Sequence, residues 1–170
     1  IAIAAKYALT HYGLERVALI DFDVHHGNGS EVAFQNDPAV LMCSFFQSPL
    51  YPYSGLNSKR QNMVNIPVPA HSNGEMIRAL VRNSWLPALE AFRPEFIFIS
   101  AGFDAHEADM LAQLELVEED YAWITTELVQ VAKKHAQGRM VSCLEGGYHL
   151  GALASSSLAH VQALMKAVSE

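Results

Sequence analysis

DFDVHHGNG, residues 21–29, follows directly on the apolar run Arg16–Ile20 and ends in glycine-rich chain. An apolar run that ends in Asp, Asn and Gly predicts a buried strand followed by a turn. Side chains alternate between two faces of a strand, so Asp21, Asp23 and His25 are expected to share one face, with apolar residues between them on the other. Two carboxylates and an imidazole would then converge at the end of this strand.

Two further apolar runs end in polar residues of the same kind. Phe96–Ser100 is followed by AGFDAH at 101–106, and Met140–Leu144 is followed by EGGYH at 145–149. One DxD after a strand could be ordinary turn chemistry, because Asp and Asn hydrogen-bond locally in turns. Three such strand ends in one chain favour a functional site instead.

Strands and helices alternate along the chain, with no internal repeat or linker. Alternation of this kind predicts an α/β fold with a parallel sheet in a three-layer α/β/α sandwich, built as a single domain over residues 1–170. Two prolines place the strand at 62–68 near an edge or a turn. The expected strands are Arg16–Asp23, Val40–Phe45, Asn62–Val68, Phe96–Ser100 and Met140–Leu144. The expected helices are Ile1–Tyr12, Glu31–Gln35, Gly74–Phe92 (capped by Asn73, with a kink or break at Pro87), Glu118–Ala136 and Ala152–Val168; 46–60 is expected to be a long loop.

Composition limits the function classes. The net charge of -7 disfavours a grip on nucleic-acid phosphates and suits a cationic substrate. No apolar stretch approaches the roughly 20 residues that cross a bilayer. Cys43 and Cys143 lie inside apolar runs and are expected to be reduced, which with no leader sequence favours an intracellular, cytoplasmic protein. Because Ile1 already lies in a helix-like segment, an upstream part of the natural protein is expected to be missing.

The carboxyl ends of parallel strands meet at one edge of a sheet, where ligands bind in α/β proteins. Asp23, His25, Asp104 and Tyr148 are therefore expected to lie together. Two carboxylates and one neutral imidazole suit Zn²⁺ or Fe²⁺, and three protein ligands leave a coordination position open. The pattern predicts a catalytic metal site.

The motifs DFDVHHGNG, SAGFDAHEAD and LEGGYHL resemble those of the histone deacetylase family, which includes bacterial deacetylase-like amidohydrolases and acetylpolyamine amidohydrolases. The resemblance runs over essentially the whole chain and implies an arginase/deacetylase-like fold that lacks its N-terminal part. It also implies that Asp23, His25 and Asp104 bind zinc. Tyr148 would then polarise the carbonyl group that is cleaved and stabilise its oxyanion.

The same resemblance implies further site residues. A structural K⁺ or Na⁺ would be held by Asp21 and by backbone carbonyls of Asp23, His25, Ser44 and Phe45, and a second one near Phe34 and Val40. Tyr51 would line the substrate channel together with Gly146 and Gly147, which let the backbone approach closely. His26 is expected to orient a metal ligand from behind, as groups around metal sites do.

The implied activity is hydrolysis of acetylated lysine or acetylated polyamine. One departure is that the family carries a pair of proton-transferring histidines upstream of this chain's first helix, so we expect weak or absent turnover from these residues alone. Met110 stands where the family is expected to have a proline. Three alternatives stay open: a metal-bearing module that binds acylated amines without cleaving them, an aspartate-nucleophile Mg²⁺ phosphohydrolase, which would need a lysine not found at these strand ends, and a second metal at His106.

Overall fold

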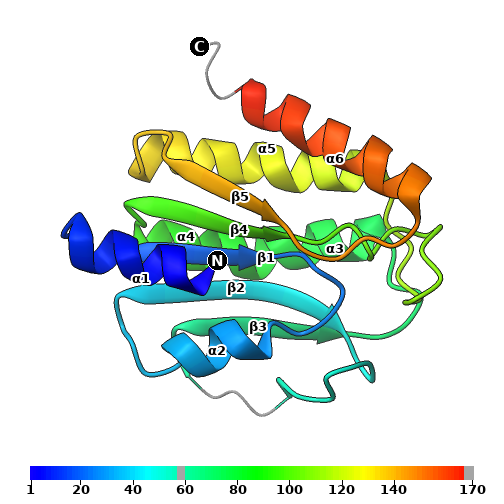
Figure 1. The fold of residues 1–170 in the computed structure, drawn as a ribbon, viewed down its shortest axis with the longest axis horizontal. Coiled ribbons are helices and arrows are strands. Elements are labelled where there is room, and N and C mark those ends of the chain that lie inside the picture. Colours follow the sequence, from blue (N-terminus) through cyan, green and yellow to red (C-terminus); the bar gives the residue numbers. More distant parts are fainter. Residues whose placement is uncertain (57–59, 167–170) are drawn as a thin grey trace.

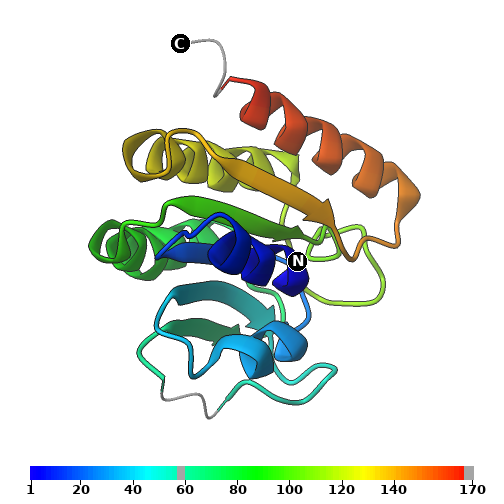
Figure 2. The same cartoon turned by 60° about the vertical axis from the view of Figure 1, so that its left-hand side comes forward.

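The computed structural model describes residues 1–56 and 60–166. Its five strands form one parallel sheet in the order β3-β2-β1-β4-β5 (Figure 1), and Figure 2 shows the strands β4 and β5 running in the same direction. The predicted α/β class and the edge position of β3 are confirmed. The strands are β1 (Val17–Asp21), β2 (Val40–Gln47), β3 (Met63–Val68), β4 (Phe96–Ala101) and β5 (Met140–Leu144).

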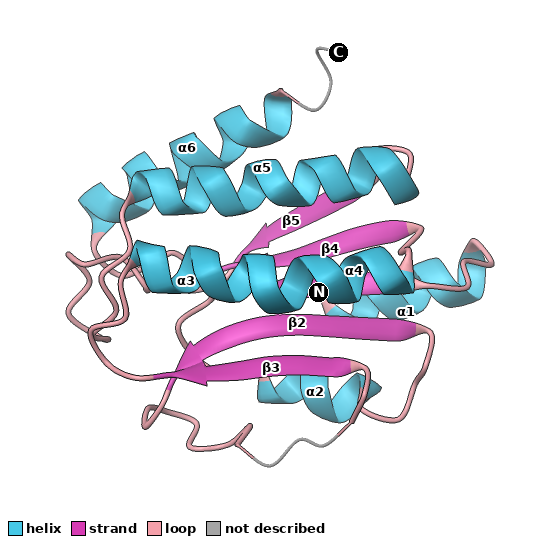
Figure 3. Cartoon of the chain, turned by 180° about the vertical axis from the view of Figure 1, so that it is seen from behind, coloured by secondary structure: helices cyan, strands magenta, loops and turns pink. Residues whose placement is uncertain are grey.

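Helices cover both faces of the sheet. Figures 1 and 3 show α1 and α2 on one face, α3 to α5 on the other, and α6 alongside α5 near the β5 edge. The helices are α1 (Ala2–His11), α2 (Asn28–Phe34), α3 (Gly74–Leu80), the π-helical turn η1 (Val81–Trp85), α4 (Leu86–Phe92), α5 (Glu118–His135) and α6 (Leu150–Met165). The last residues of the helix expected to reach Val168, and 57–59 of the expected loop, lie outside the described residues.

The central strand β1 is buried along its whole length. Ala18 and Ile20 belong to the larger core, with residues of α3 to α5 such as Trp85 and Tyr121. Val17 and Leu19 belong to a smaller core under α1 and α2. Because both faces of β1 are buried, the position of this strand is fixed by packing on two sides. The loop that follows β1 therefore begins at a well-defined position.

The helix expected over 74–92 is confirmed as one run of helical residues from Gly74 to Phe92, and the interruption expected at Pro87 divides it into three segments. Asn73 caps α3 as predicted, since its side chain accepts a hydrogen bond from Met76 N at 3.1 Å. The π-helical turn η1 then ends two residues before Pro87, near the start of α4. Proline has no N–H and its ring crowds the carbonyl four residues earlier, and a wider turn relieves that crowding.

Smaller differences concern element ends. α2 starts at Asn28, three residues earlier than expected, and β2 continues to Gln47. β1 stops at Asp21, two residues short of the prediction.

None of the described helices is both long enough and apolar enough to cross a membrane.

Candidate metal centre

Adjacent strands bring the candidate ligands together. β1 pairs with β4 in parallel, with Asp21 opposite Ser100, so the two chains leave the sheet side by side. Asp23 and His25 lie in the loop after β1, and Asp104 lies in the loop after β4. The convergence predicted from the strand ends is therefore seen in the fold.

The loop after β1 is bent rather than extended, contrary to the expected strand over 16–23. Asp21 Oδ1 accepts a hydrogen bond from Asp23 N at 3.1 Å, and Asp23 Oδ1 accepts one from His25 N at 2.8 Å. Such side chain to backbone bonds build turns in place of a sheet ladder. Phe22 and Val24 are nevertheless fully buried. These two apolar side chains pack into the core, so the expected alternation between apolar and polar side chains is kept although the loop is bent.

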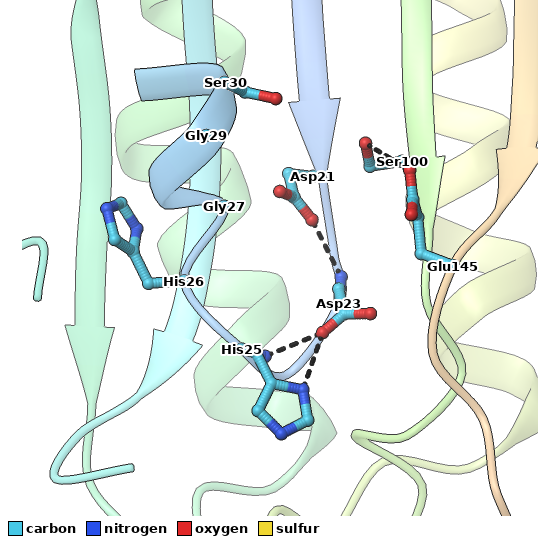
Figure 4. A pocket seen from close by; sticks show the side chains of 9 residues that line it. All are labelled: Asp21, Asp23, His25, His26, Gly27, Gly29, Ser30, Ser100 and Glu145. Atoms are coloured by element: carbon cyan, nitrogen blue, oxygen red, sulfur yellow. Dashed lines mark hydrogen bonds and ion pairs between the residues drawn. The ribbon is translucent and has the colours of Figure 1, made fainter. Parts of the chain in front are cut away.

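The three side chains meet closely. His25 Nδ1 lies 3.0 Å from Asp23 Oδ1 and 3.1 Å from Asp104 Oδ2. One potential ligand atom from each residue lies within 4.8 Å of the others. Figure 4 shows Asp23 and His25 directed toward each other at the end of β1. Across residues 1–56 and 60–166, this is the one group of three His, Cys, Asp or Glu side chains with such spacing.

Backbone amides hold both carboxylates in place. Val24 N donates to Asp104 Oδ1 at 2.9 Å, and Gly146 N donates to Asp23 Oδ2 at 2.8 Å. The opposite oxygen of Asp104, Oδ2, is buried and has no partner with hydrogen-bond geometry among the described residues, although His25 Nδ1 is at ion-pair distance. Each carboxylate is therefore oriented by the protein, and Asp104 keeps one oxygen without a hydrogen bond.

Glycine is required at two positions where the backbone passes close to the side chains of Asp23 and Asp104. A Cβ atom on Gly146 would lie 2.0 Å from Asp104 Oδ2 and 2.6 Å from Asp23 Oδ2. A Cβ atom on Gly102 would lie 2.4 Å from Asp23 Oδ2. Real Cβ atoms do not approach so closely, so any side chain at 146 would fill the space beside the candidate ligand oxygens.

The electrostatics of the trio favour a positive charge. The Asp104 carboxylate, followed by that of Asp23, raises the pKa of His25 to about 10. Burial raises the pKa of Asp104. Burial also acts to raise the pKa of Asp23, but hydrogen bonds from His25 and Gly146 outweigh it and lower the pKa overall. Two hard oxygen ligands and an imidazole around a strongly negative point fit a divalent cation such as Zn²⁺.

Two hollows open beside the trio, and Asp23 and His25 line both. The first, of about 200 Å³, is also lined by Asp21, Ser100 and Glu145 (Figure 4). The second, of about 460 Å³, has Tyr51, Gly146 and Tyr148 in its wall. The rings of His25 and Tyr51 lie 6.3 Å apart, edge to face. Tyr51 and Gly146, predicted for a substrate channel, therefore lie together beside the candidate ligands, whereas Gly147 is not in the wall of this hollow.

Tyr148 lies just before α6, and its side chain is 57% exposed. Partial burial, and then the charges of Asp104 and Asp23, raise the pKa of Tyr148. Gly147 next to it has φ of +137°, a conformation that only glycine adopts readily. The hydroxyl is thus kept protonated, as a hydrogen-bond donor, on a turn that needs its glycine.

Asp21 lies apart from the trio at the very end of β1, opposite Ser44 of β2 in the parallel register, with Phe45 next along that strand. Burial, followed by the charge of Asp23, raises the pKa of Asp21 well above its usual value. Gly27 backs onto it, since a Cβ there would lie 2.3 Å from Asp21 Oδ2. The monovalent cation implied for these residues stays a prediction.

The residues implied for a second monovalent cation already have a partner. The side-chain nitrogen of Asn62, Nδ2, donates to three backbone carbonyls at once. The accepting oxygens belong to Phe34 at 2.9 Å and to Asp37 and Val40 at 3.0 Å each. A cation on the carbonyls of Phe34 and Val40 would have to displace this amide.

His26 does not orient a metal ligand, contrary to expectation. Its side chain points away from Asp21 and Asp23 in Figure 4, its Nε2 pairs with Glu31 at 2.5 Å, and its ring packs against Phe46. The preceding residue, His25, turns toward the ligands because successive side chains leave the bent loop in opposite directions. His26 therefore ties α2 to β2.

His106 also lies away from the trio. Its Nδ1 accepts a hydrogen bond from Ala108 N at 3.0 Å, and its Nε2 faces Glu118 of α5 at 3.5 Å. The DxH spacing thus does not bring a second imidazole to the metal centre. Sequence reasoning also missed Asp109, whose carboxylate accepts hydrogen bonds from the backbone of Tyr148 and His149. Its place at the end of the second motif, directly before Met110, was the one available signal.

Both the sequence and the fold of this chain match known proteins. The family model described as histone deacetylase domain matches residues 1–164. The chain is 37% identical over 171 residues to histone deacetylase 14, chloroplastic, of Arabidopsis thaliana, covering 97% of this chain and 40% of that protein. It is 37% identical over 155 residues to the histone deacetylase-like amidohydrolase of Pseudomonas aeruginosa, covering 87% of this chain and 41% of the relative.

A solved structure of the histone deacetylase Clr3 superimposes with a TM-score of 0.88 at 30% identity. The match covers 97% of this chain and 30% of that one. The chain therefore spans half or less of the length of these three proteins, while its own fold is matched almost completely.

Proposed function

This chain belongs to the histone deacetylase family, and from that premise we propose that it carries the metal centre of a zinc-dependent amidohydrolase that removes acetyl groups from amines. The observation that supports this most directly is the meeting of Asp23, His25 and Asp104 around one point. Three protein ligands with an open position are typical of catalytic zinc sites. Fe²⁺ is the alternative metal for the same ligands.

The proposed substrates are acetylated lysine and acetylated polyamines. The hollow of about 460 Å³ beside the trio has Tyr51 and Tyr148 in its wall, so an acylated side chain could approach between two aromatic rings. The net charge of -7 favours a substrate that carries further amino groups. An acyl carbonyl at the inner end of this hollow would lie next to the candidate ligands.

When bound, zinc supplies a Lewis acid and lowers the pKa of a coordinated water to about 7. Asp23, His25 and Asp104 would hold the ion. Tyr148 would donate a hydrogen bond to the acyl oxygen as negative charge develops there, an interaction worth about 3 to 4 kcal/mol in comparable sites. The raised pKa of Tyr148 keeps its proton available for this role.

One observation favours a second candidate, a module that binds acylated amines without cleaving them. His25 is a ligand in this proposal, and His26 pairs with Glu31. Neither imidazole is then free to act as the general base that amide hydrolysis needs. In the family such a pair of histidines comes from upstream sequence, and turnover would depend on that segment.

The first experiment is metal analysis of the purified protein and two variants. We expect about one zinc per chain in the wild type and its loss in Asp104→Asn. Asp120→Asn is the matched control, because Asp120 is a buried carboxylate that pairs with Arg78 away from the trio. Zinc that Asp104→Asn retains in full would contradict the proposed centre.

The second experiment measures acetate release from an acetyl-lysine peptide by the zinc-loaded protein. Tyr148→Phe should lower kcat by about 100- to 1,000-fold, as expected for loss of one oxyanion donor, without releasing zinc. Peptide binding that depends on zinc, with no acetate released by the wild type, would support the binding module over catalysis by these residues alone.

A further inference from the structure

The backbone around Tyr148 fixes where its hydroxyl can reach. More than half of the side chain is exposed, so packing alone does not hold the ring. The turn that carries it runs from β5 to α6 and contains Gly147 at φ +137°. Such a turn keeps one shape only if its amide groups are bound to fixed partners.

Asp109 supplies those partners on the α6 side. Its carboxylate, on the loop after β4, is 5% exposed. Oδ2 accepts hydrogen bonds from Tyr148 N at 2.7 Å and from His149 N at 3.1 Å. Oδ1 accepts one from Leu111 N at 3.0 Å, which fixes the carboxylate in its own loop. One buried side chain thus joins two loops that are 39 residues apart in sequence.

The two halves of the turn have different anchors. On the β5 side, Gly146 N is held by Asp23, a candidate metal ligand. On the α6 side, Asp109 holds the amides of Tyr148 and His149, and His149 is the N-cap residue of α6. A carboxylate at a helix N-terminus is favoured by the helix dipole, and its bonds to N–H groups are the strong, charge-assisted kind.

We propose that Asp109 is a positioning residue for Tyr148: it fixes the backbone from which the hydroxyl reaches the acyl oxygen. This inference rests on the proposed function of Tyr148. The predicted consequence is that Asp109 affects the chemical step through the Tyr148 hydroxyl, while metal and substrate binding stay close to wild type. Misplacement of a reacting group by about 1 Å costs on the order of 100-fold in rate.

A double-mutant cycle on the intact, zinc-loaded protein tests this, with an acetyl-lysine peptide as substrate. Asp109→Ala should lower kcat by about 10- to 100-fold with little change in KM. Asp109→Asn keeps one acceptor oxygen for the amides of Tyr148 and His149 but turns its NH2 group toward Leu111 N, so it should recover part of the loss. Adding Asp109→Ala to Tyr148→Phe should cause little further loss, because the hydroxyl that Asp109 positions is already gone.

Asp120→Ala serves as the matched control for loss of a buried carboxylate. It should lower stability, leave kcat unchanged, and combine with Tyr148→Phe without coupling. If the losses from Asp109→Ala and Tyr148→Phe multiply in the double variant, Asp109 acts through the fold alone and the inference is wrong.

Amide hydrogen exchange separates this inference from the proposed function. Asp109→Ala should speed exchange at the amides of Tyr148 and His149, while the core amides of α5 keep their protection. Unchanged exchange at these two amides would overturn the inference even if the enzyme is active. A wild-type protein that binds zinc but releases no acetate would instead overturn the proposed catalysis.

Discussion

His160 is a buried imidazole that should make the fold sensitive to acid. It is 3% exposed on α6, and its ring lies edge to face against Phe22 and Phe103, the residues directly before Asp23 and Asp104. Burial lowers the pKa of His160 to about 4. The imidazole is therefore neutral in the folded protein at neutral pH.

Hydrogen bonds determine which ring nitrogen of the neutral His160 side chain carries the proton. Thr125 Oγ1 donates to Tyr121 O at 2.6 Å, so it accepts from His160 Nδ1 at 2.6 Å. His160 Nε2 is then left to accept from Ser142 Oγ at 2.9 Å. A second ring proton on Nε2 would have an acceptor only if the Ser142 hydroxyl turned a lone pair toward it, and the resulting positive charge would still be buried.

The magnitude follows from the difference in pKa between the two states. The unfolded value is 6.5 and the folded value about 4. Between these values the unfolded chain binds more protons, so the free energy of unfolding falls as the pH is lowered through this window. About 2.5 pKa units at 1.36 kcal/mol each give a loss of about 3 kcal/mol by pH 4, and none above about pH 7.

Urea denaturation of metal-free protein at a series of pH values between about 7 and 4 measures this loss. His160→Gln should remove it, so the difference in unfolding free energy between wild type and variant should change by about 3 kcal/mol over the range. Ser142→Ala keeps the imidazole and should keep most of the pH dependence. Parallel curves for wild type and His160→Gln would refute the reasoning.

Two further substitutions test the centre and its surroundings. Gly146→Ala would place a methyl group 2.0 Å from Asp104 Oδ2, and zinc affinity measured by competition with a chelator should fall by at least about tenfold; wild-type affinity would show that the loop can move aside. Asn62→Ala removes the donor shared by three backbone carbonyls, and urea denaturation should show a loss of about 1 to 3 kcal/mol. If K⁺ then restores stability to Asn62→Ala more than Li⁺ does, the vacated carbonyls bind a cation; equal recovery would argue against that second site.

Sequence alone predicted the parts of this protein that depend on local pattern. Apolar runs marked all five strands, and β5 was predicted to the residue. The ligand trio followed from a general property of parallel sheets, because strand ends meet whatever the details of the loops. That is why Asp23 and Asp104 were found although the loop after β1 is bent and not extended.

What the sequence did not reveal depends on contacts between distant segments. The direction of His26 is set by Glu31 and by packing against β2, neither of which has a local signature. Asp109 stood in a recognised motif, yet its role needs the loop after β5 to fold back over it. The π-helical turn before Pro87 was predicted only as a kink or break, because a proline marks where a helix is disturbed and not how the backbone adjusts.

The distance in sequence between the candidate ligands has a kinetic consequence. Val24 N reaches Asp104 across 80 residues, and the intervening chain holds β2, β3, α3 and α4. Contacts between residues so far apart in sequence form slowly, because the entropy cost of closing a long loop comes before any stabilising bond is made. We therefore expect zinc to bind during refolding only after β1 has paired with β4. The rate of zinc uptake would then report how fast the centre of the sheet forms.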